Sequence, residues 1–348
     1  MALYADSLAS LPYSEVLNQC LRIGSIISTA SSYAAQRSSS RPSKSRDMRE
    51  IGCGLQGAAF EQPGQPHVLK KEHPGNSALP TNIRHEHLMH ELVAAAFDQF
   101  STVSGCDTQV PRLFRFIERA DLAERELARF PEGYRTRENT MEMERILPMP
   151  KVVRSSLVGL AHGSQDILDK IPNKHCLLRT YLGRSPPKNE TNSLRNYPLD
   201  LETMESLGLD VDHVADSMGA AFAIMHWGAG INGDDVEFVL GTKLLSQIED
   251  FIQERKVLFY LLDFGQCDFV DLTDEEPATV YQAFKGAMVT GDNQLFVPNL
   301  VQRPDLYKSF REGYIRAGKI VLQQRKLGHV FDVETFLAQY EEYAQDFL

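Results

Sequence analysis

Carboxylate residues stand beside two apolar segments in the second half of the sequence. Asp234 and Asp235 directly precede residues 236–240, and Asp263 directly follows residues 259–262. Short apolar runs of this kind are typical of buried strands, so we expect the two to pair and to present their carboxylates at a turn. Oxygen ligands suit Mg²⁺, which is usually shared between one or two carboxylates and the phosphates of a substrate. The spacing therefore predicts a magnesium site.

A glycine-rich segment lies near the start of the chain, where Gly52, Gly54 and Gly57 form the pattern Gly-x-Gly-x-x-Gly. Glycines let the backbone turn tightly and approach phosphate oxygens with its N–H groups. In a dinucleotide-binding unit a helix should follow, but the prolines of residues 62–66 stop one. A short strand that ends in Lys70 follows instead, which is the arrangement that kinases use to hold nucleotide phosphates.

A helix is predicted over residues 82–100, because apolar side chains recur there at helical spacing. In kinase-like folds a glutamate on this helix holds the strand lysine, and Glu86 and Glu91 are both candidates. We favour Glu86, since the apolar turns that face the core begin just after it. The predicted cofactor-binding residues are Gly52, Gly54, Gly57, Lys70 and Glu86.

The remaining pattern predicts the elements that position these residues. Strands are expected over residues 110–116, 140–147 and 176–182, with Pro148 and Pro150 marking a hinge after the second. A polar, basic and serine-rich segment, residues 37–46, is typical of a flexible linker. Helical spacing predicts five further helices, over residues 14–35, 210–225, 242–256, 304–324 and 333–347.

Composition limits the class of protein. The chain has 348 residues and a net charge of −11, which argues against nucleic acid and against an anionic membrane surface as partners. The five cysteines are scattered and form no Cys-x-x-Cys pair, which favours reduced thiols in an intracellular protein, cytoplasmic or nuclear. Neither a secretory signal nor an apolar run of membrane-spanning length is visible in the sequence.

The order of these features resembles the protein-kinase-like fold, which protein kinases share with aminoglycoside and choline phosphotransferases. A glycine loop, strand lysine, helix glutamate, hinge, a loop headed by His226 and an Asp-Phe-Gly segment at Asp263 follow one another. The resemblance implies an α+β fold of two lobes, with ATP and Mg²⁺ as ligands. It divides the chain into an N-terminal helix and linker (1–46), a small β-rich N-lobe (47–150) and a larger helical C-lobe with insertions (151–348).

Four blocks resemble more closely an uncharacterised fungal family, which carries a domain of unknown function and is sometimes labelled zinc-finger-like. This resemblance covers roughly residues 47–300 and implies a fold and a fungal origin without an agreed activity. The scattered cysteines give the zinc-finger label no support. The blocks are residues 144–148, 226–229, 235–241 and 262–265.

One departure from the kinase pattern concerns catalysis. Kinases have an aspartate two residues after the loop histidine, where this chain has Gly228, so the group that accepts the hydroxyl proton is missing from its usual place. Asp235 stands immediately before a strand, the metal-binding position, so we assign it and Asp263 to Mg²⁺. Asp234 is left as the candidate base. We expect His226 to brace the loop through hydrogen bonds.

Two functions stay open at this point. The first is an ATP- and Mg²⁺-dependent phosphotransferase acting on the hydroxyl of a small molecule or of a protein. The second is a catalytically impaired pseudokinase that serves as a regulatory or protein-interaction module in a fungal pathway. A third, a zinc-dependent regulator, would need clustered ligands, which the sequence does not show.

Overall fold

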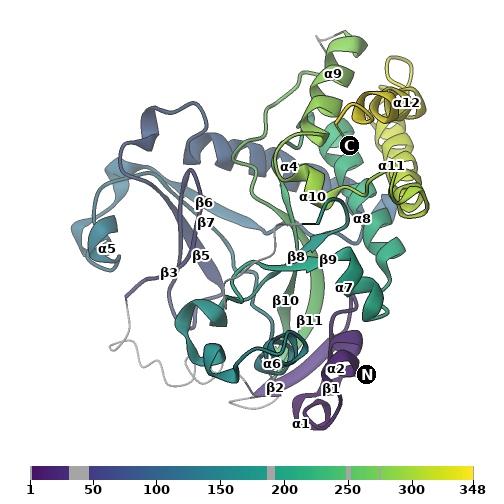
Figure 1. Cartoon of the computed structure of the whole chain (residues 1–348). Helices are drawn as coiled ribbons and strands as arrows, with labels where there is room; N and C mark the ends of the chain where they lie inside the picture. The colour runs from purple at the N-terminus through teal and green to yellow at the C-terminus, as the bar shows by residue number, and fades with distance from the viewer. Residues whose placement is uncertain (1, 31–46, 186–192, 248–251, 274–275, 348) are drawn as a thin grey trace.

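The computed structural model describes residues 2–30, 47–185, 193–247, 252–273 and 276–347. Within these residues the fold is mixed α+β, with one five-stranded sheet and one curled six-stranded sheet. The long helices of the second half of the chain gather on the side of the six-stranded sheet that is away from the five-stranded one (Figure 1). The predicted linker, residues 37–46, lies outside the described residues.

The five-stranded sheet carries the glycine loop and the strand lysine. Its strand order is β3-β4-β5-β7-β6, and every neighbouring pair is antiparallel. The strands predicted around residues 67–70, 110–116 and 140–147 are confirmed. Their bounds are β3 (Arg49–Cys53), β4 (Gly57–Glu61), β5 (His67–Glu72), β6 (Leu113–Ile117) and β7 (Thr140–Glu144).

The six-stranded sheet carries the acidic residues of the second half of the chain. Its strand order is β1-β2-β11-β10-β8-β9, and its centre is the long antiparallel hairpin of β10 and β11. The register sets Glu237 opposite Leu262, so Asp263 leaves the sheet beside the start of β10. The bounds are β1 (Leu3–Tyr4), β2 (Ile26–Ala30), β8 (Leu178–Tyr181), β9 (Tyr197–Asp200), β10 (Glu237–Gln247) and β11 (Ile252–Leu262).

The predicted helix over residues 242–256 is wrong where the structure describes this segment, because residues 242–247 belong to β10 and residues 252–256 to β11; residues 248–251 lie outside the described residues. Burial alternates along β11 from Ile252 to Leu258, the period of a strand with one buried face. Its apolar residues also fit helical spacing, and short apolar runs do not distinguish the two. In the structure β11 pairs with β10 on one side and with β2 on the other, and this pairing favours the strand over the helix.

The helix predicted over residues 14–35 is wrong between residues 21 and 30, and its last part, residues 31–35, lies outside the described residues. Helix α2 (Tyr13–Cys20) ends there, and β2 (Ile26–Ala30) then pairs antiparallel with β11. Leu17 and Ile27 are both fully buried, so the two elements share the core of the molecule. The domain boundary at residue 46 stays a prediction. Strand β2, which precedes that boundary, lies in the same sheet as β10 and β11.

The other predicted helices are confirmed. Asn82 caps α4 (Ile83–Ser104) through a hydrogen bond from the His85 N–H, and α4 ends at Gly105, whose φ is 65°. Helix α8 (Val211–Ala223) continues into a π-helical turn, η6 (Ile224–Ala229). The remaining helices are α1 (Ala5–Leu8), α5 (Glu124–Leu127), α6 (Lys151–Leu160), α7 (Leu201–Ser206), α9 (Pro277–Met288), α10 (Asn293–Phe296), α11 (Pro304–Gln324) and α12 (Val333–Ala344). Across the described part of the chain, none of these helices has the length and apolarity needed to cross a membrane.

Candidate functional site

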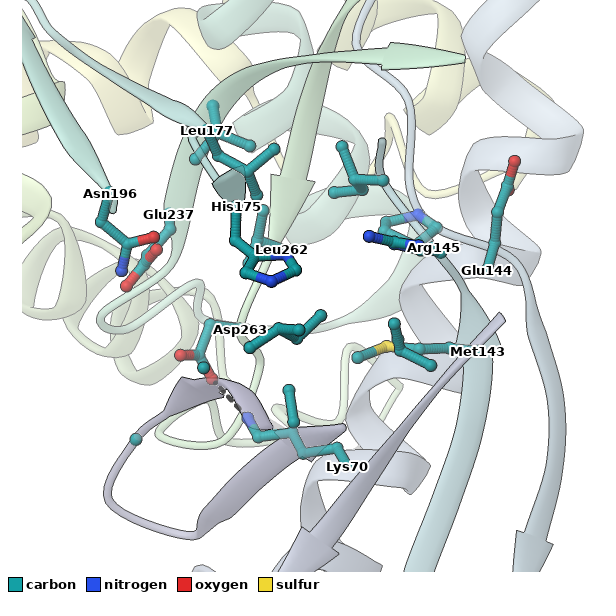
Figure 2. Close-up of a pocket in the computed structure, with 18 of the residues that line it drawn as sticks. Lys70, Met143, Glu144, Arg145, His175, Leu177, Asn196, Glu237, Leu262 and Asp263 are labelled. Carbon is teal, nitrogen blue, oxygen red and sulfur yellow. Dashed lines mark hydrogen bonds and ion pairs between the residues drawn. The ribbon is translucent and has the colours of Figure 1, made fainter. Parts of the chain in front are cut away.

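A cavity of about 230 Å³ lies between the two sheets. Strands β3, β4, β5 and β7 supply one wall, and β8, β10 and the end of β11 supply the other (Figure 2). Concave sites that bring a few polar groups together are the usual places for small ligands. The polar and charged residues that line it are Lys70, Glu86, His90, Glu144, Arg145, His175, Arg179, Asn196, Glu237 and Asp263.

A buried lysine lies between two carboxylates at one end of this cavity. Lys70 Nζ is 2.6 Å from Glu86 Oε1 and 3.1 Å from Asp263 Oδ1, and Figure 2 shows the second of these contacts. Only 10% of the Lys70 side chain and 3% of the Glu86 side chain are exposed. The expectation that Glu86 rather than Glu91 pairs with the strand lysine is confirmed, since Glu91 is exposed to solvent.

The electrostatics of this triad keep Lys70 charged. Burial alone would lower the pKa of Lys70, but Asp263 and Glu86 outweigh it and raise that pKa, so the ammonium stays charged. Burial raises the pKa of Glu86 to about 7, against the attraction of Lys70, so at neutral pH this carboxyl carries only part of a negative charge. Asp263 is the more exposed acid of the triad, with 31% of its side chain exposed, and its oxygens are the ones open to a further cation.

The backbone at Asp263 is held in a conformation that is rare for residues with a side chain. Its φ is 66°, in the left-handed region, and Asn196 on the same cavity wall has a φ of 48°. Such conformations are unfavourable by roughly 1–3 kcal/mol and persist where the surroundings impose them, often at ligand sites. The strain therefore marks the Asp263 end of the cavity as the candidate site.

Helix α4 fixes the segment that follows Asp263. The buried ring of Phe264 lies 4.9 Å from the ring of His90, whose Nε2 donates to the carbonyl of Pro111 over 2.7 Å. One turn earlier, His85 Nε2 donates to the carbonyl of Cys267 over 2.7 Å. The helix that supplies Glu86 therefore also positions the carboxylate that shares its lysine.

The glycine loop packs against the Asp-Phe-Gly segment. Gly52, Gly54 and Gly57 all line the cavity, as the sequence leads one to expect of a phosphate loop. Gly57 has a second reason to be glycine, because a Cβ there would lie 2.2 Å from the Lys71 carbonyl oxygen of the next strand. At the tip of the glycine loop, the buried side chain of Gln56 packs against Gly265. A Cβ on Gly265 would lie 2.6 Å from the Gln56 Cδ.

The two aspartates assigned to catalysis bind a neighbouring loop. Asp234 Oδ1 accepts from Thr290 Oγ1 over 2.8 Å, and Asp235 Oδ1 accepts from the Asp292 N–H over 2.9 Å. Among the described residues, the wall of the cavity does not include either of them. Burial raises the pKa of Asp235, and the nearby carboxylates, Asp263 among them, raise it further. The structure thus brings Asp263 together with Lys70 and Glu86, while Asp234 and Asp235 lie beside that group; their roles stay predictions.

Sequence analysis missed the carboxylate of Glu237, which does line the cavity. It forms an ion pair with Arg179 of β8, and only 14% of its side chain is exposed. Burial raises the pKa of Glu237 to about 7, although Arg179 opposes this. A signal was present, because a charged residue inside an apolar strand must be paired or functional. Only the register shows that Glu237 and Asp263 share one wall (Figure 2).

His226 braces the loop, as expected. Nε2 faces the carbonyl of Asn232 at 3.1 Å and therefore carries the proton, so Nδ1 accepts from the Tyr314 hydroxyl at 2.7 Å. The imidazole is fully buried and stacks on Phe284 with 4.2 Å between ring centroids. Burial lowers its pKa to about 3, so it is neutral at physiological pH.

The position of the missing catalytic aspartate points away from the cavity. A Cβ on Gly228 would lie 3.1 Å from the Ala96 Cβ and 3.2 Å from the Phe100 ring, both on α4. A carboxylate there would be pressed against apolar side chains of that helix. Introducing the usual aspartate with Gly228→Asp is therefore expected to destabilise the fold and not to supply a base.

Metal binding is limited to sites with few protein ligands. Within the described ranges, no group of three or more His, Cys, Asp or Glu side chains is arranged to hold a metal ion. Mg²⁺ with a nucleotide needs only one or two carboxylates, since phosphates and water complete its coordination. Asp263, on the wall of the cavity, offers such a site one carboxylate.

Acid is expected to weaken the fold through His226. In the unfolded chain His226 takes up a proton near its ordinary pKa of 6.5, whereas in the folded protein it does so only near a pKa of about 3. The folded protein therefore loses stability as the pH falls below 6.5. In urea unfolding, the advantage of the wild type over His226→Gln should shrink by about 2 kcal/mol between pH 6.5 and pH 5. A difference that does not change with pH would contradict a neutral, buried imidazole.

Comparison of the chain with known proteins gives no match to a protein-family model and no match to a curated protein.

Proposed function

We propose that the protein is a phosphotransferase of kinase-like, two-lobed fold, which binds Mg²⁺ and ATP in the cavity between the sheets and acts on a hydroxyl of a small molecule or protein. The observation that carries this proposal is the buried contact of Lys70 with both Glu86 and Asp263 beneath a glycine loop. A lysine in this setting is a fixed cation, and Asp263 offers oxygen to a metal.

The residues of the cavity fit the proposed ligand at three points. Lys70 would hold phosphate oxygens, with Glu86 keeping it extended. Asp263 would hold the metal, and Gly52 and Gly54 would let the loop backbone approach the phosphates. When bound, Mg²⁺ neutralises charge on the phosphates that are transferred.

The cavity also has an apolar part, which suits a flat ring. Both sheets supply its side chains, namely Val68 and Met143 from the five-stranded sheet side and Leu177, Val239 and Leu262 from the other. Figure 2 shows Met143, Leu177 and Leu262 among the side chains around this space. The cavity thus combines an apolar part for a base with a charged part for phosphates.

A second candidate is the pseudokinase, a regulatory or protein-interaction module without phosphoryl transfer. A specific observation favours it: the carboxylates of Asp234 and Asp235 are bonded to Thr290 and to the Asp292 backbone. For catalysis both would have to exchange these bonds for contacts with ligand and acceptor.

Substitution of the two aspartates separates the candidates. If the protein is a phosphotransferase, Asp235→Ala should weaken Mg·ATP binding and turnover together. Asp234→Ala should leave binding unchanged and slow turnover by about 10²-fold, the lower end of what a general base contributes. Binding is measured by calorimetry and turnover by ADP release with candidate hydroxyl acceptors. Asp305→Ala, at a site exposed on α11, serves as the control.

The outcomes are distinct. Turnover that is unchanged in both aspartate variants would remove their catalytic assignment. Mg·ATP binding without turnover in any form of the protein would establish the pseudokinase instead.

A further inference from the structure

A second cavity, of about 370 Å³, lies beside the first. Arg145, Pro148 and His175 line both cavities. Residues of both sheets meet in its wall, with Arg49 from β3 and Glu61 from β4 on one side, and Thr29 from β2 on the other. The start of α6 completes it.

This cavity is strongly basic in a protein whose net charge is −11. Of the described residues, two carboxylates line it, Glu61 and Asp169, and Glu61 already forms an ion pair with Arg145. The six basic side chains that line it are Arg49, Arg145, Lys151, Arg154, Lys174 and Arg255. Positive charge of this density in a concave site attracts anions.

Two of the guanidinium groups are built into the wall. Arg154 is 9% exposed and donates to the carbonyls of Met149, Leu168 and Asn173 over 3.2, 3.3 and 3.1 Å. Arg255 is 6% exposed and donates from Nη2 to Gln253 Oε1 over 3.1 Å. The carbonyl oxygens that accept from Arg154 carry no formal charge, so these contacts leave its positive charge in place.

The pKa of His175 reflects the positive charge around it. Burial lowers its pKa to about 4, and four arginines, Arg145 and Arg154 among them, lower it further. Lys151 begins α6, whose N-terminal N–H groups add partial positive charge at the same wall. Lys151 and Lys174 are exposed and can move to meet a ligand.

We propose that the second cavity binds a compact polyanion carrying phosphate groups, at a site separate from the cavity that holds Lys70. Guanidinium groups match phosphate oxygens in pairs, and lysines add mobile charge. Because residues of both sheets line the site, an occupant holds the sheets together on the side of α6.

Inorganic pyrophosphate is the probe that tests this site, with titration calorimetry and thermal unfolding at constant ionic strength. The double variant Lys151→Ala/Lys174→Ala should bind pyrophosphate at least about tenfold more weakly than the wild type. The double variant Lys308→Ala/Lys319→Ala removes the same charge from exposed positions on α11 and should bind as the wild type does. Equal affinity of the two double variants would overturn the proposal.

The double variant Lys70→Met/Glu86→Gln separates this site from the proposed nucleotide site, because it changes only the first cavity and leaves no buried charge unpaired. Pyrophosphate binding should persist in this double variant, and its loss there would place the anion in the first cavity and refute the second site. Citrate, a polyanion of carboxylates, should bind at least about tenfold more weakly than pyrophosphate. Equal binding of the two would refute the phosphate specificity. Failure of Mg·ATP to bind would leave these results unaffected, so the two proposals fail separately.

Discussion

Replacing Lys70 by Met is expected to abolish the stabilisation of the protein by Mg·ATP. Lys70 is the cation that the cavity presents beside Asp263, and Met has a similar length without the charge. At about 100 times the dissociation constant, a ligand stabilises the folded state by about 2.7 kcal/mol, which thermal unfolding detects readily. Asp263→Asn should have the same effect with Mg·ATP, since the amide is a poorer metal ligand.

The Lys70→Met variant needs a second substitution beside it, because Lys70→Met leaves the buried Glu86 carboxylate without its cation. Removing one member of a buried ion pair destabilises a fold by about 3–5 kcal/mol. The double variant Lys70→Met/Glu86→Gln removes the unpaired charge and should recover most of the stability without recovering nucleotide binding. Lys308→Met, with 75% of its side chain exposed, is the control for the lost charge. A Mg·ATP shift of wild-type size in the double variant would refute the proposed role of Lys70.

The largest loss of stability is expected where α8 and α11 cross. A Cβ on Gly219 of α8 would lie 1.9 Å from the Phe310 carbonyl oxygen, and one on Gly313 of α11 would lie 2.0 Å from the Asp216 carbonyl oxygen. Backbone atoms cannot move aside as flexible side chains do, so the helices would have to separate. We expect Gly219→Ala to reduce the free energy of unfolding by about 3 kcal/mol or more.

This crossing matters for the site because α8 leads into the turn that carries His226, and His226 bonds to Tyr314 of α11. Gly286→Ala in α9 is the matched control, since no heavy atom lies within 4 Å of the added Cβ. It should raise stability by about 0.5–1 kcal/mol, the helix preference of Ala over Gly. Urea unfolding of both variants checks the pair, and similar values for the two would contradict the close helix contact.

Elements whose signals are local could be predicted from the amino-acid sequence. Prolines after the glycine loop excluded a helix, and the helical spacing that begins just after Glu86 identified both α4 and the glutamate that meets Lys70. His226 was expected to be structural, and it is buried and hydrogen-bonded on both nitrogens. These features depend on residue type and on short spacing, which the chain carries wherever it folds.

Features that depend on pairing between distant segments could not be predicted from local sequence patterns. Residues 242–247, 252–256 and 26–30 are strands because β11 pairs with β10 on one side and with β2 on the other, which outweighs local helical spacing. The same pairing sets Glu237 beside Asp263, and the loop near residue 291 draws Asp235 away from the cavity wall. Strand register and loop contacts join residues far apart in the chain, so no local pattern encodes which carboxylates share a site.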